Sequence, residues 1–295
     1  MNEFKTYHPI VNLFYFLFTI IFSCLFMHPV CLSISIGCSF AYSVILGGKK
    51  TFKSNLIYMI PMIILTAMLN PLFNHEGVTI IRYLPNGNPL TLESVVYGVL
   101  AAVMIASVIC WFSCYNRVMT SDKFIYLFGR IIPALSLIIS MTLRFVPRFT
   151  AQIKTVSASQ KLMGRDISSG NIIKRASCGL SILSIMITWS LENAVETADS
   201  MKARGYGFPG RTAFSIYKFD RRDLSSLCAI LFLATYILAG YILGVADFNC
   251  FPVIKSINYT PYTISVFSAY FLLCAFPIII ELWEVRRWKA LKSKI

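Results

Sequence analysis

Charged residues are scarce in this sequence, and their scarcity excludes an ordinary soluble domain. Asp, Glu, Lys and Arg make up 14% of the 295 residues, whereas soluble globular proteins carry about 25%. About 20 mostly apolar residues suffice to cross the hydrocarbon core of a bilayer, so long uncharged runs predict an integral membrane protein. Such runs cover residues 6–48, 54–75, 94–116, 224–246 and 256–280.

These runs are long enough for six membrane spans. The first run holds two of them, because His28-Pro29 interrupts it and a proline breaks the hydrogen-bond ladder of a helix. The spans contain almost no ionisable residue, which argues against a self-sufficient ion-coupled transporter. The expected spans are 11–28, 30–47, 54–71, 93–114, 224–245 and 262–283.

Sequence signals of catalysis and metal binding are also missing. The nine cysteines include no Cys-x-x-Cys pair, and His8, His28 and His75 lie far apart. We therefore expect neither a disulfide framework nor a bound metal ion. The sequence has no Gly-rich phosphate-binding loop, no Gly-x-Ser-x-Gly motif and no His-Glu-x-x-His motif. We expect no cofactor in this chain and no ATP hydrolysis by it.

Positive charge is abundant, but almost all of it lies on one side of the membrane that the predicted spans cross. The formal net charge is +14, yet the predicted external loops 72–92 and 246–261 hold only Arg82 and Lys255 among the 27 Lys and Arg residues. Lys and Arg concentrate in the cytoplasmic segments of membrane proteins. The charge therefore indicates topology and not nucleic-acid binding. It predicts a multi-pass protein of the cell membrane with cytoplasmic N- and C-termini.

The longest segment between predicted spans, residues 115–223, contains 16 Lys and Arg against 7 Asp and Glu. Its apolar residues recur at helical spacing. We predict one long helix from Pro133 to Met163 and a second from about Ile172 to Arg204. The second ends where a glycine, Gly205, and a nearby proline, Pro209, stop a helix.

The predicted fold is all-α: a polytopic membrane helical bundle of about six spans with two long cytoplasmic coupling helices. We divide the chain into an N-terminal transmembrane bundle (1–114), a coupling-helix region (115–223) and a C-terminal transmembrane pair with a basic tail (224–295). A rival interpretation makes the two long helices a tightly packed re-entrant pair. If residues 131–147 and 176–191 both crossed the membrane, the number of spans would be eight and both termini would stay cytoplasmic.

Two short motifs end the two long helices. The first is Ser159-Gln160-Lys161-Leu162-Met163-Gly164-Arg165-Asp166, and the second contains Ala203-Arg204-Gly205-Tyr206-Gly207. With Leu143-Arg144-Phe145-Val146-Pro147 upstream, the chain resembles the T component of energy-coupling factor (ECF) transporters over nearly its whole length. The second motif matches the family's Ala-Arg-Gly pattern in full. In the first, Met163 stands at the arginine position, and either Arg165 or Lys161 supplies the charge instead.

The resemblance implies a role in transport without catalysis. T components link two ABC-type ATPase subunits, which bind the ATP, to a small membrane substrate-binding S component in the lipid bilayer. The ATPases can be the same or different, and the cargo is a vitamin, a metal ion or a similar micronutrient. The residues that carry over to ATPase coupling are Lys161, Met163, Gly164, Arg165, Asp166, Ala203, Arg204 and Gly205.

Other functions stay open at this point. An isolated Ala-Arg-Gly string is an ordinary helix C-terminus, because a cation is favoured in the last turn and glycine follows it. A stand-alone secondary transporter is one alternative, although buried charge is scarce. A membrane-embedded lipid-modifying enzyme is another, although Asp122, Asp166 and Asp199 are scattered and not clustered.

Overall fold

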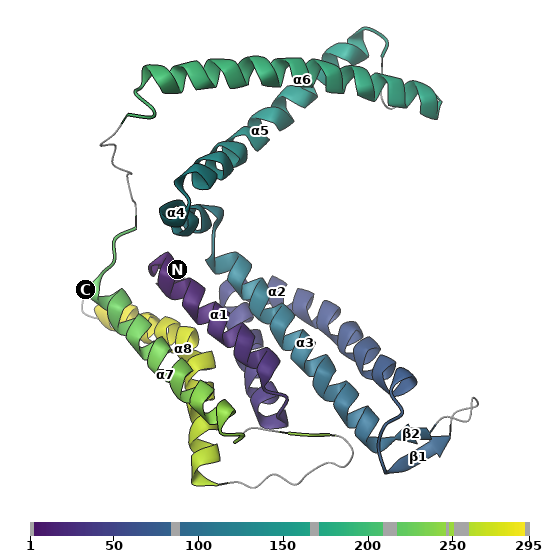
Figure 1. Ribbon diagram of the computed structural model, residues 1–295, viewed down its shortest axis with the longest axis vertical. Coiled ribbons are helices and arrows are strands. Elements are labelled where there is room, and N and C mark those ends of the chain that lie inside the picture. The colour runs from purple at the N-terminus through teal and green to yellow at the C-terminus, as the bar shows by residue number, and fades with distance from the viewer. Residues whose placement is uncertain are drawn as a thin grey trace. The chain divides into compact units, whose positions relative to one another are not determined.

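The computed structural model describes residues 3–83, 89–165, 171–208, 217–245, 248–250 and 260–292. Apart from one short hairpin, every regular element in these residues is a helix, which confirms the predicted fold class (Figure 1). The elements are η1 (Glu3–Thr6), α1 (Pro9–Leu25), α2 (Pro29–Phe73), β1 (Ile80–Tyr83), β2 (Pro89–Thr91), α3 (Leu92–Val118), α4 (Ser121–Ile131), α5 (Pro133–Leu162), α6 (Ile172–Ala203), α7 (Arg221–Ile242) and α8 (Pro261–Lys292).

The chain forms two compact units. The bundle unit comprises Met1–Phe124 and Tyr217–Ile295, and the helix-pair unit comprises Ile125–Ile216. The bundle unit contains α1, α2, α3, α7 and α8, which hold the six predicted spans. The helix-pair unit contains α5 and α6, whose bounds agree with the two predicted long helices to within one residue.

Histidine–proline pairs begin the first two membrane helices. His8 and His28 are the N-caps of α1 and α2, and each is followed by a proline at the first helical position, where the missing N–H costs nothing. The Nδ1 atom of His8 accepts the N–H of Ile10 at 3.3 Å, and that of His28 accepts the N–H of Val30 at 3.2 Å. The predicted break at His28-Pro29 is therefore confirmed.

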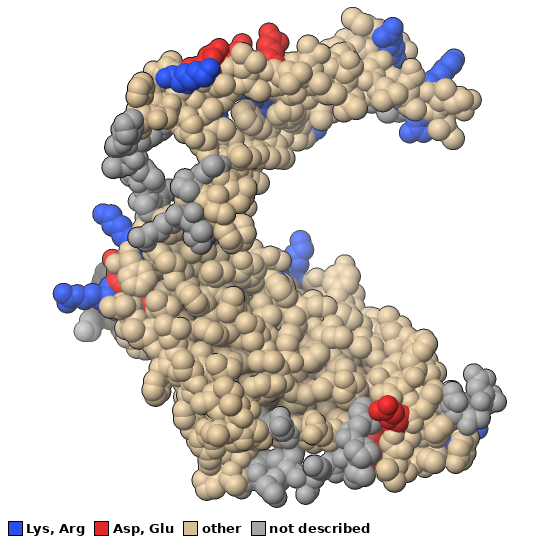
Figure 2. Space-filling view, viewed as in Figure 1, with Lys and Arg blue, Asp and Glu red and all other residues tan. Residues whose placement is uncertain are grey.

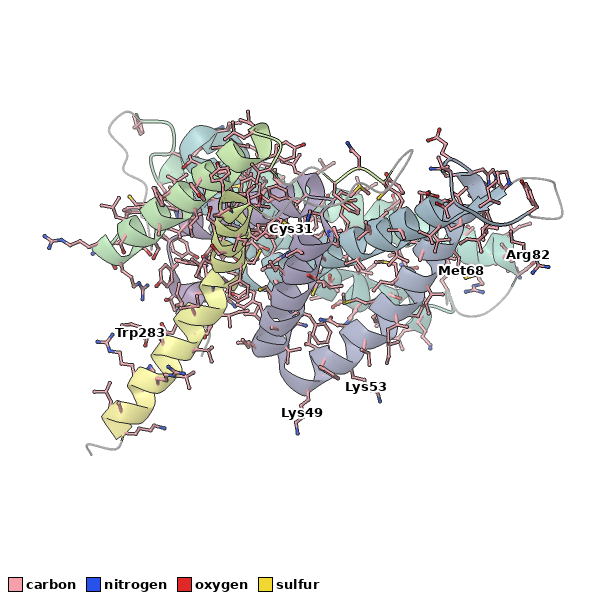
Figure 3. The ribbon with its side chains drawn as sticks, turned by 90° about the horizontal axis from the view of Figure 1, so that it is seen from below. Cys31, Lys49, Lys53, Met68, Arg82 and Trp283 are labelled. Atoms are coloured by element: carbon pink, nitrogen blue, oxygen red, sulfur yellow. The ribbon has the colours of Figure 1, made fainter. Side chains whose placement is uncertain are left out.

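Helix α2 contains two predicted spans in one bent element. Its 45 residues would extend about 68 Å if straight, which exceeds the roughly 30 Å hydrocarbon core. The bend lies at Gly48, whose φ of 65° and ψ of −162° are not helical. Lys49 and Lys53 project from this bend (Figure 3). A Cβ atom on Gly47 would overlap the guanidinium group of Arg117 from α3.

Among the residues that the structure describes, five helices are long and apolar enough to cross a membrane by length and composition: α2, α3, α6, α7 and α8. Helix α1 is apolar but has 17 residues. The inclusion of α6 differs from the prediction that the second long helix is cytoplasmic. The choice between a cytoplasmic helix pair and additional spans therefore stays a prediction.

An aromatic core holds the bundle unit together. Trp111, Tyr15 and Tyr42 are fully buried, and the rings of Tyr15 and Trp111 pack edge to face at 6.0 Å. The indole N–H of Trp111 donates to the hydroxyl of Ser35 at 3.0 Å, so this polar atom is satisfied inside the apolar core. These contacts join α1, α2 and α3 into one body.

The short elements of the structure were not predicted from the sequence. In the segment 72–92, β1 and β2 pair antiparallel, with Ile80 opposite Thr91. Next to this hairpin the buried carboxylate of Glu93 accepts the hydroxyl of Thr79 at 2.7 Å. The other two are η1 at the N-terminus and α4, whose 11 residues follow α3 after Thr120.

Candidate functional site at two capped helix ends

The first motif forms a glycine cap at the C-terminus of α5. The N–H of Gly164 donates to the carbonyl of Lys161 at 3.0 Å, and the N–H of Arg165 donates to the carbonyl of Gln160 at 3.0 Å. This pair of bonds is the Schellman motif, which satisfies carbonyls that the helix end leaves unpaired. Gly164 has a φ of 76°, which glycine adopts without the cost that a Cβ atom brings.

The second motif forms the same cap at the C-terminus of α6. The N–H of Gly205 donates to the carbonyl of Lys202 at 2.9 Å, and the N–H of Tyr206 donates to the carbonyl of Met201 at 3.0 Å. Gly205 has a φ of 75° and Gly207 a φ of 103°. The helix stop predicted at Gly205 is therefore confirmed.

Because the two caps share one hydrogen-bond pattern, their residues correspond position by position. Met163 and Arg204 are the C-caps of their helices. Lys161 corresponds to Lys202, because the backbone carbonyl of each lysine accepts the N–H of the glycine in its own cap. Arg165 then corresponds to Tyr206. The backbone thus places Met163 where the second motif has its arginine.

Both ends are open to solvent. Leu162 and Met163 expose 91% and 74% of their surface at the first end, and Phe208 exposes 73% at the second. Arg165 and Arg204 are also exposed. Figure 2 shows basic side chains toward both ends of α6. Each end therefore presents an apolar surface next to a cation, which is a combination suited to a partner groove.

A small apolar cluster packs α5 against α6. Its members are Val156 on α5 and Cys178, Ile182 and Met186 on α6, with Phe149 and Trp189 packed beside them at 5.3 Å between ring centres. The thiol of Cys178 lies 3.0 Å from the carbonyl oxygen of Arg165. The first cap is thus attached to the second turn of α6.

A shallow groove of about 460 Å³ lies between α5 and α6 and reaches the second cap. Arg144 and Arg148 on α5 line it together with Glu196 and Arg204 on α6. The guanidinium group of Arg148 also lies 5.5 Å from the ring of Trp189. Arg204 forms no ion pair within the described part of the chain. The groove therefore offers several guanidinium groups to a carboxylate from outside.

The structure divides the predicted site residues between two places. Lys161, Met163, Gly164 and Arg165 lie at the end of α5, whereas Ala203, Arg204 and Gly205 lie at the end of α6. Asp166 lies outside the described residues. Two of the groove arginines, Arg144 and Arg148, were not among the predicted site residues. Their i, i+4 spacing places them on one helix face and could have indicated them as a pair, but not their place beside Arg204. No cluster of His, Cys, Asp or Glu suited to a metal ion occurs in the described ranges.

Comparison with known proteins identifies the family. A family model described as CbiQ, cobalt transport protein, matches residues 5–214, which is more than half of the chain. The chain is 34% identical over 105 residues to the energy-coupling factor transporter transmembrane protein EcfT of Lactobacillus helveticus, covering 35% of this chain and 38% of that protein. It is 32% identical over 111 residues to the EcfT of Bacillus selenitireducens, covering 37% and 41%.

A longer match reaches the EcfT of Acidaminococcus fermentans, with 30% identity over 164 residues, 52% of this chain and 60% of that protein. The chain thus spans about two fifths to three fifths of the length of these relatives. It belongs to the CbiQ family of cobalt transport proteins, and the similarity to transmembrane components of ECF transporters that its motifs predicted is confirmed.

Proposed function

We propose that this chain is the coupling and scaffold subunit of an ECF-type ABC importer. Its two helix ends dock on two ATPase subunits, one end on each, and pass their ATP-driven motion to a membrane-embedded S component. The observation that carries the proposal is the repeated cap: two exposed helix ends with one hydrogen-bond pattern, which present cations beside apolar side chains. A repeated geometry suits a paired partner.

Arginine and glycine have separate roles at the second end. The Arg204 guanidinium can pair in bidentate fashion with a carboxylate in an ATPase groove. Arg144 and Arg148 line the same groove between α5 and α6 and add positive potential around it. Gly205 has no side chain, so the groove wall can approach the backbone closely.

At the first end Arg165 is the stronger candidate for the replaced charge. Lys161 corresponds to Lys202, which stands beside Arg204 in the second cap. A lysine at that position is therefore common to both ends and does not substitute for an arginine. Arg165 is the cation that the first end has in addition, and it is exposed.

The remaining partners follow from this role. The ATPases bind and hydrolyse ATP, and they can be one kind or two. The S component is a small membrane protein that selects the cargo, a vitamin, a metal ion or a similar micronutrient. The chain lies in the cell membrane with both termini cytoplasmic, in agreement with the asymmetry of its Lys and Arg residues.

The test is affinity purification in mild detergent from native membranes, followed by mass spectrometry of the proteins that accompany the chain. Wild type and Arg204→Glu are compared with a control, Lys154→Glu, which reverses an exposed charge on α5 away from both caps and the groove. We expect ABC-type ATPases with wild type and the control, and their loss with Arg204→Glu. Equal recovery of the ATPases with Arg204→Glu would refute the assigned role of this end.

A further inference from the structure

The N-terminal residues 3–8 pack on the bundle unit as a plug, in which Phe4, Tyr7 and His8 are buried. The plug consists of η1 followed by Tyr7 and His8, which caps α1. Phe4 is fully buried, and its ring meets those of Tyr15 on α1 at 5.2 Å and Phe276 on α8 at 6.4 Å. The backbone N–H of Phe4 donates to the carboxylate of Glu281 on α8 at 3.4 Å. The plug is therefore an integral part of the bundle unit.

The plug lies where the chain leaves the bundle unit and returns to it. The chain leaves after Phe124 and re-enters at Tyr217. We call residues 119–124 the outgoing connector and residues 217–223 the returning connector. Thr120 and Tyr217, one on each connector, lie close enough for their side chains to interact. Both attachment points of the helix-pair unit thus lie side by side on the bundle.

A buried lysine ties the outgoing connector to the plug. Lys123 is 3% exposed, and its ammonium donates to the backbone carbonyl of Lys5 at 2.6 Å. With the Asn12 amide oriented to satisfy both neighbours, its oxygen accepts from Lys123 at 2.7 Å and its nitrogen donates to the carbonyl of Phe4 at 3.1 Å. An ammonium is buried at high cost unless it is hydrogen-bonded, so these bonds hold Lys123 in one place.

A buried carboxylate ties the returning connector to the plug. Asp223 is 2% exposed and accepts the backbone N–H of His8 at 3.3 Å and that of Asp220 at 3.2 Å. The ring of His8 packs edge to face against Phe219 at 5.1 Å. Removal of the carboxylate would leave buried N–H groups without a partner, which costs more than the net worth of the bonds.

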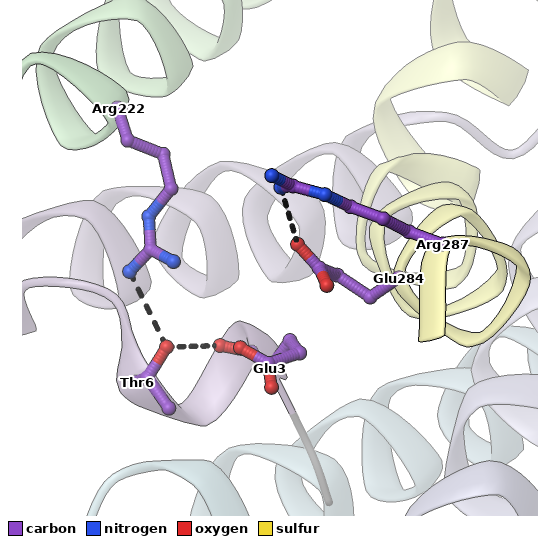
Figure 4. Close-up of polar contacts among 5 residues, drawn as sticks. All are labelled: Glu3, Thr6, Arg222, Glu284 and Arg287. Carbon is purple, nitrogen blue, oxygen red and sulfur yellow. Dashed lines mark hydrogen bonds and ion pairs between the residues drawn. The ribbon is translucent and has the colours of Figure 1, made fainter. Parts of the chain in front are cut away.

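A second contact with the returning connector lies at the surface. The guanidinium group of Arg222 lies 4.2 Å from the ring centre of Tyr7 and donates to the hydroxyl of Thr6 at 3.3 Å (Figure 4). The Thr6 hydroxyl in turn donates to the carbonyl of Glu3 at 2.7 Å. A cation over an aromatic face is attracted by the ring quadrupole. Two residues of the plug, Thr6 and Tyr7, therefore contact Arg222.

We propose that the N-terminal plug is a positioning element that fixes both connectors to the bundle at one point. The positioning residues on the connectors are Lys123 on the outgoing one and Asp223 on the returning one. Neither belongs to the coupling motifs. When the plug holds the connectors, a movement of the helix-pair unit is transmitted to the bundle. When the connectors are free to move, they absorb that movement. This consequence for transport rests on the proposed coupling function, while the anchoring itself does not.

Hydrogen–deuterium exchange of the purified full chain tests the anchoring without any partner. Lys123→Met removes the ammonium, and Lys5→Met is the matched control, because it removes an exposed lysine from the plug but keeps the carbonyl that accepts from Lys123. We expect exchange to accelerate about tenfold in both connectors with Lys123→Met, while the middle of α3 and the Lys5→Met protein keep the wild-type rates. Unchanged connectors, or the same acceleration throughout α3, would overturn the proposal.

A milder variant covers the case in which Lys123→Met does not fold. Arg222→Gln removes the contacts with Tyr7 and Thr6 from an exposed position. It should accelerate exchange in the plug and the returning connector but not in α3. Wild-type exchange at both places would count against the plug as an anchor.

The transport consequence is measured with the reconstituted complex. Uptake per ATP hydrolysed should fall several-fold with Lys123→Met, while ATPase activity and complex assembly persist and Lys5→Met behaves as wild type. Unchanged uptake per ATP with loosened connectors would refute the positioning role in transport. If the wild-type chain recruits no ATPase, the proposed function fails, and the exchange result still decides the anchoring.

Discussion

Replacing the cap glycines with alanine separates helix termination from partner contact. Gly164 and Gly205 have nearly the same φ, 76° and 75°. Their surroundings differ, because a Cβ atom at Gly164 meets no other atom within 4 Å, whereas one at Gly205 lies 3.3 Å from the ring of Phe208. The two substitutions therefore impose the same backbone penalty with different local crowding.

The size of that penalty follows from the conformation. A left-handed residue with a Cβ atom costs about 1–2 kcal/mol, and the lower freedom of alanine in the unfolded chain offsets about 0.4–1 kcal/mol of this. Each cap therefore loses about 1 kcal/mol of stability, which is about a fivefold change in the ratio of closed to open caps. Phe208 is 73% exposed and can move away, so the additional crowding at Gly205 costs little.

The assay is hydrogen exchange of the amides that close each cap, those of Gly164 and Arg165 and those of Gly205 and Tyr206. Both alanine variants should exchange about fivefold faster at their own cap and at the wild-type rate at the other. If Gly205→Ala then reduces uptake more than Gly164→Ala, close approach of a partner at the second end explains the difference. Slower exchange in either variant would refute the left-handed cap and the reasoning built on it.

Three further predictions concern single side chains. Met163→Arg should leave the fold intact and preserve or raise uptake, because the position is exposed and the helix C-terminus favours a cation by about 0.3–1 kcal/mol; loss of uptake in proteoliposomes would show that an apolar residue is required there. Arg165→Ala should lower uptake more than Lys161→Ala, and the reverse order would assign the charge to the lysine. Burial, with Lys5 acting in the same direction and Asp223 opposing it, lowers the pKa of Lys123 to about 8, whereas an unfolded lysine has a pKa of about 10.4. Between these values the unfolded state binds more protons, so the melting temperature of wild type relative to Lys123→Met should rise with pH from about 8 to 10; a falling difference would contradict the lowered pKa of the buried lysine.

Local signals in the sequence predicted the two long helices α5 and α6 well. A proline at the first position of α5 and a glycine after the last turn of each helix fix the bounds without reference to distant residues. The same signals predicted the start of α2 at Pro29. They did not decide what happens at Gly48, because helix-forming residues resume directly after it and the helix bends without ending.

Features that depend on distant residues were beyond these signals. Asp223 meets His8, which is 215 positions away along the chain, and Lys123 meets Lys5 across 118 positions. No periodicity connects such pairs, so the plug becomes visible only in the fold. The groove beside Arg204 was missed for the same reason, since Arg144 and Arg148 reach it from another helix. The roles of the site residues in coupling stay predictions.

The most direct test of the coupling account is site-specific photocrosslinking in native membranes. A photoreactive amino acid at Met163 and, separately, at Tyr206 probes the two helix ends, and one at Phe232 on α7, which is 72% exposed, serves as the control. We predict that both helix-end positions yield adducts with ABC-type ATPase peptides and that the control position yields none. Adducts without ATPase peptides at both ends would contradict the claim that these caps couple ATP hydrolysis to transport.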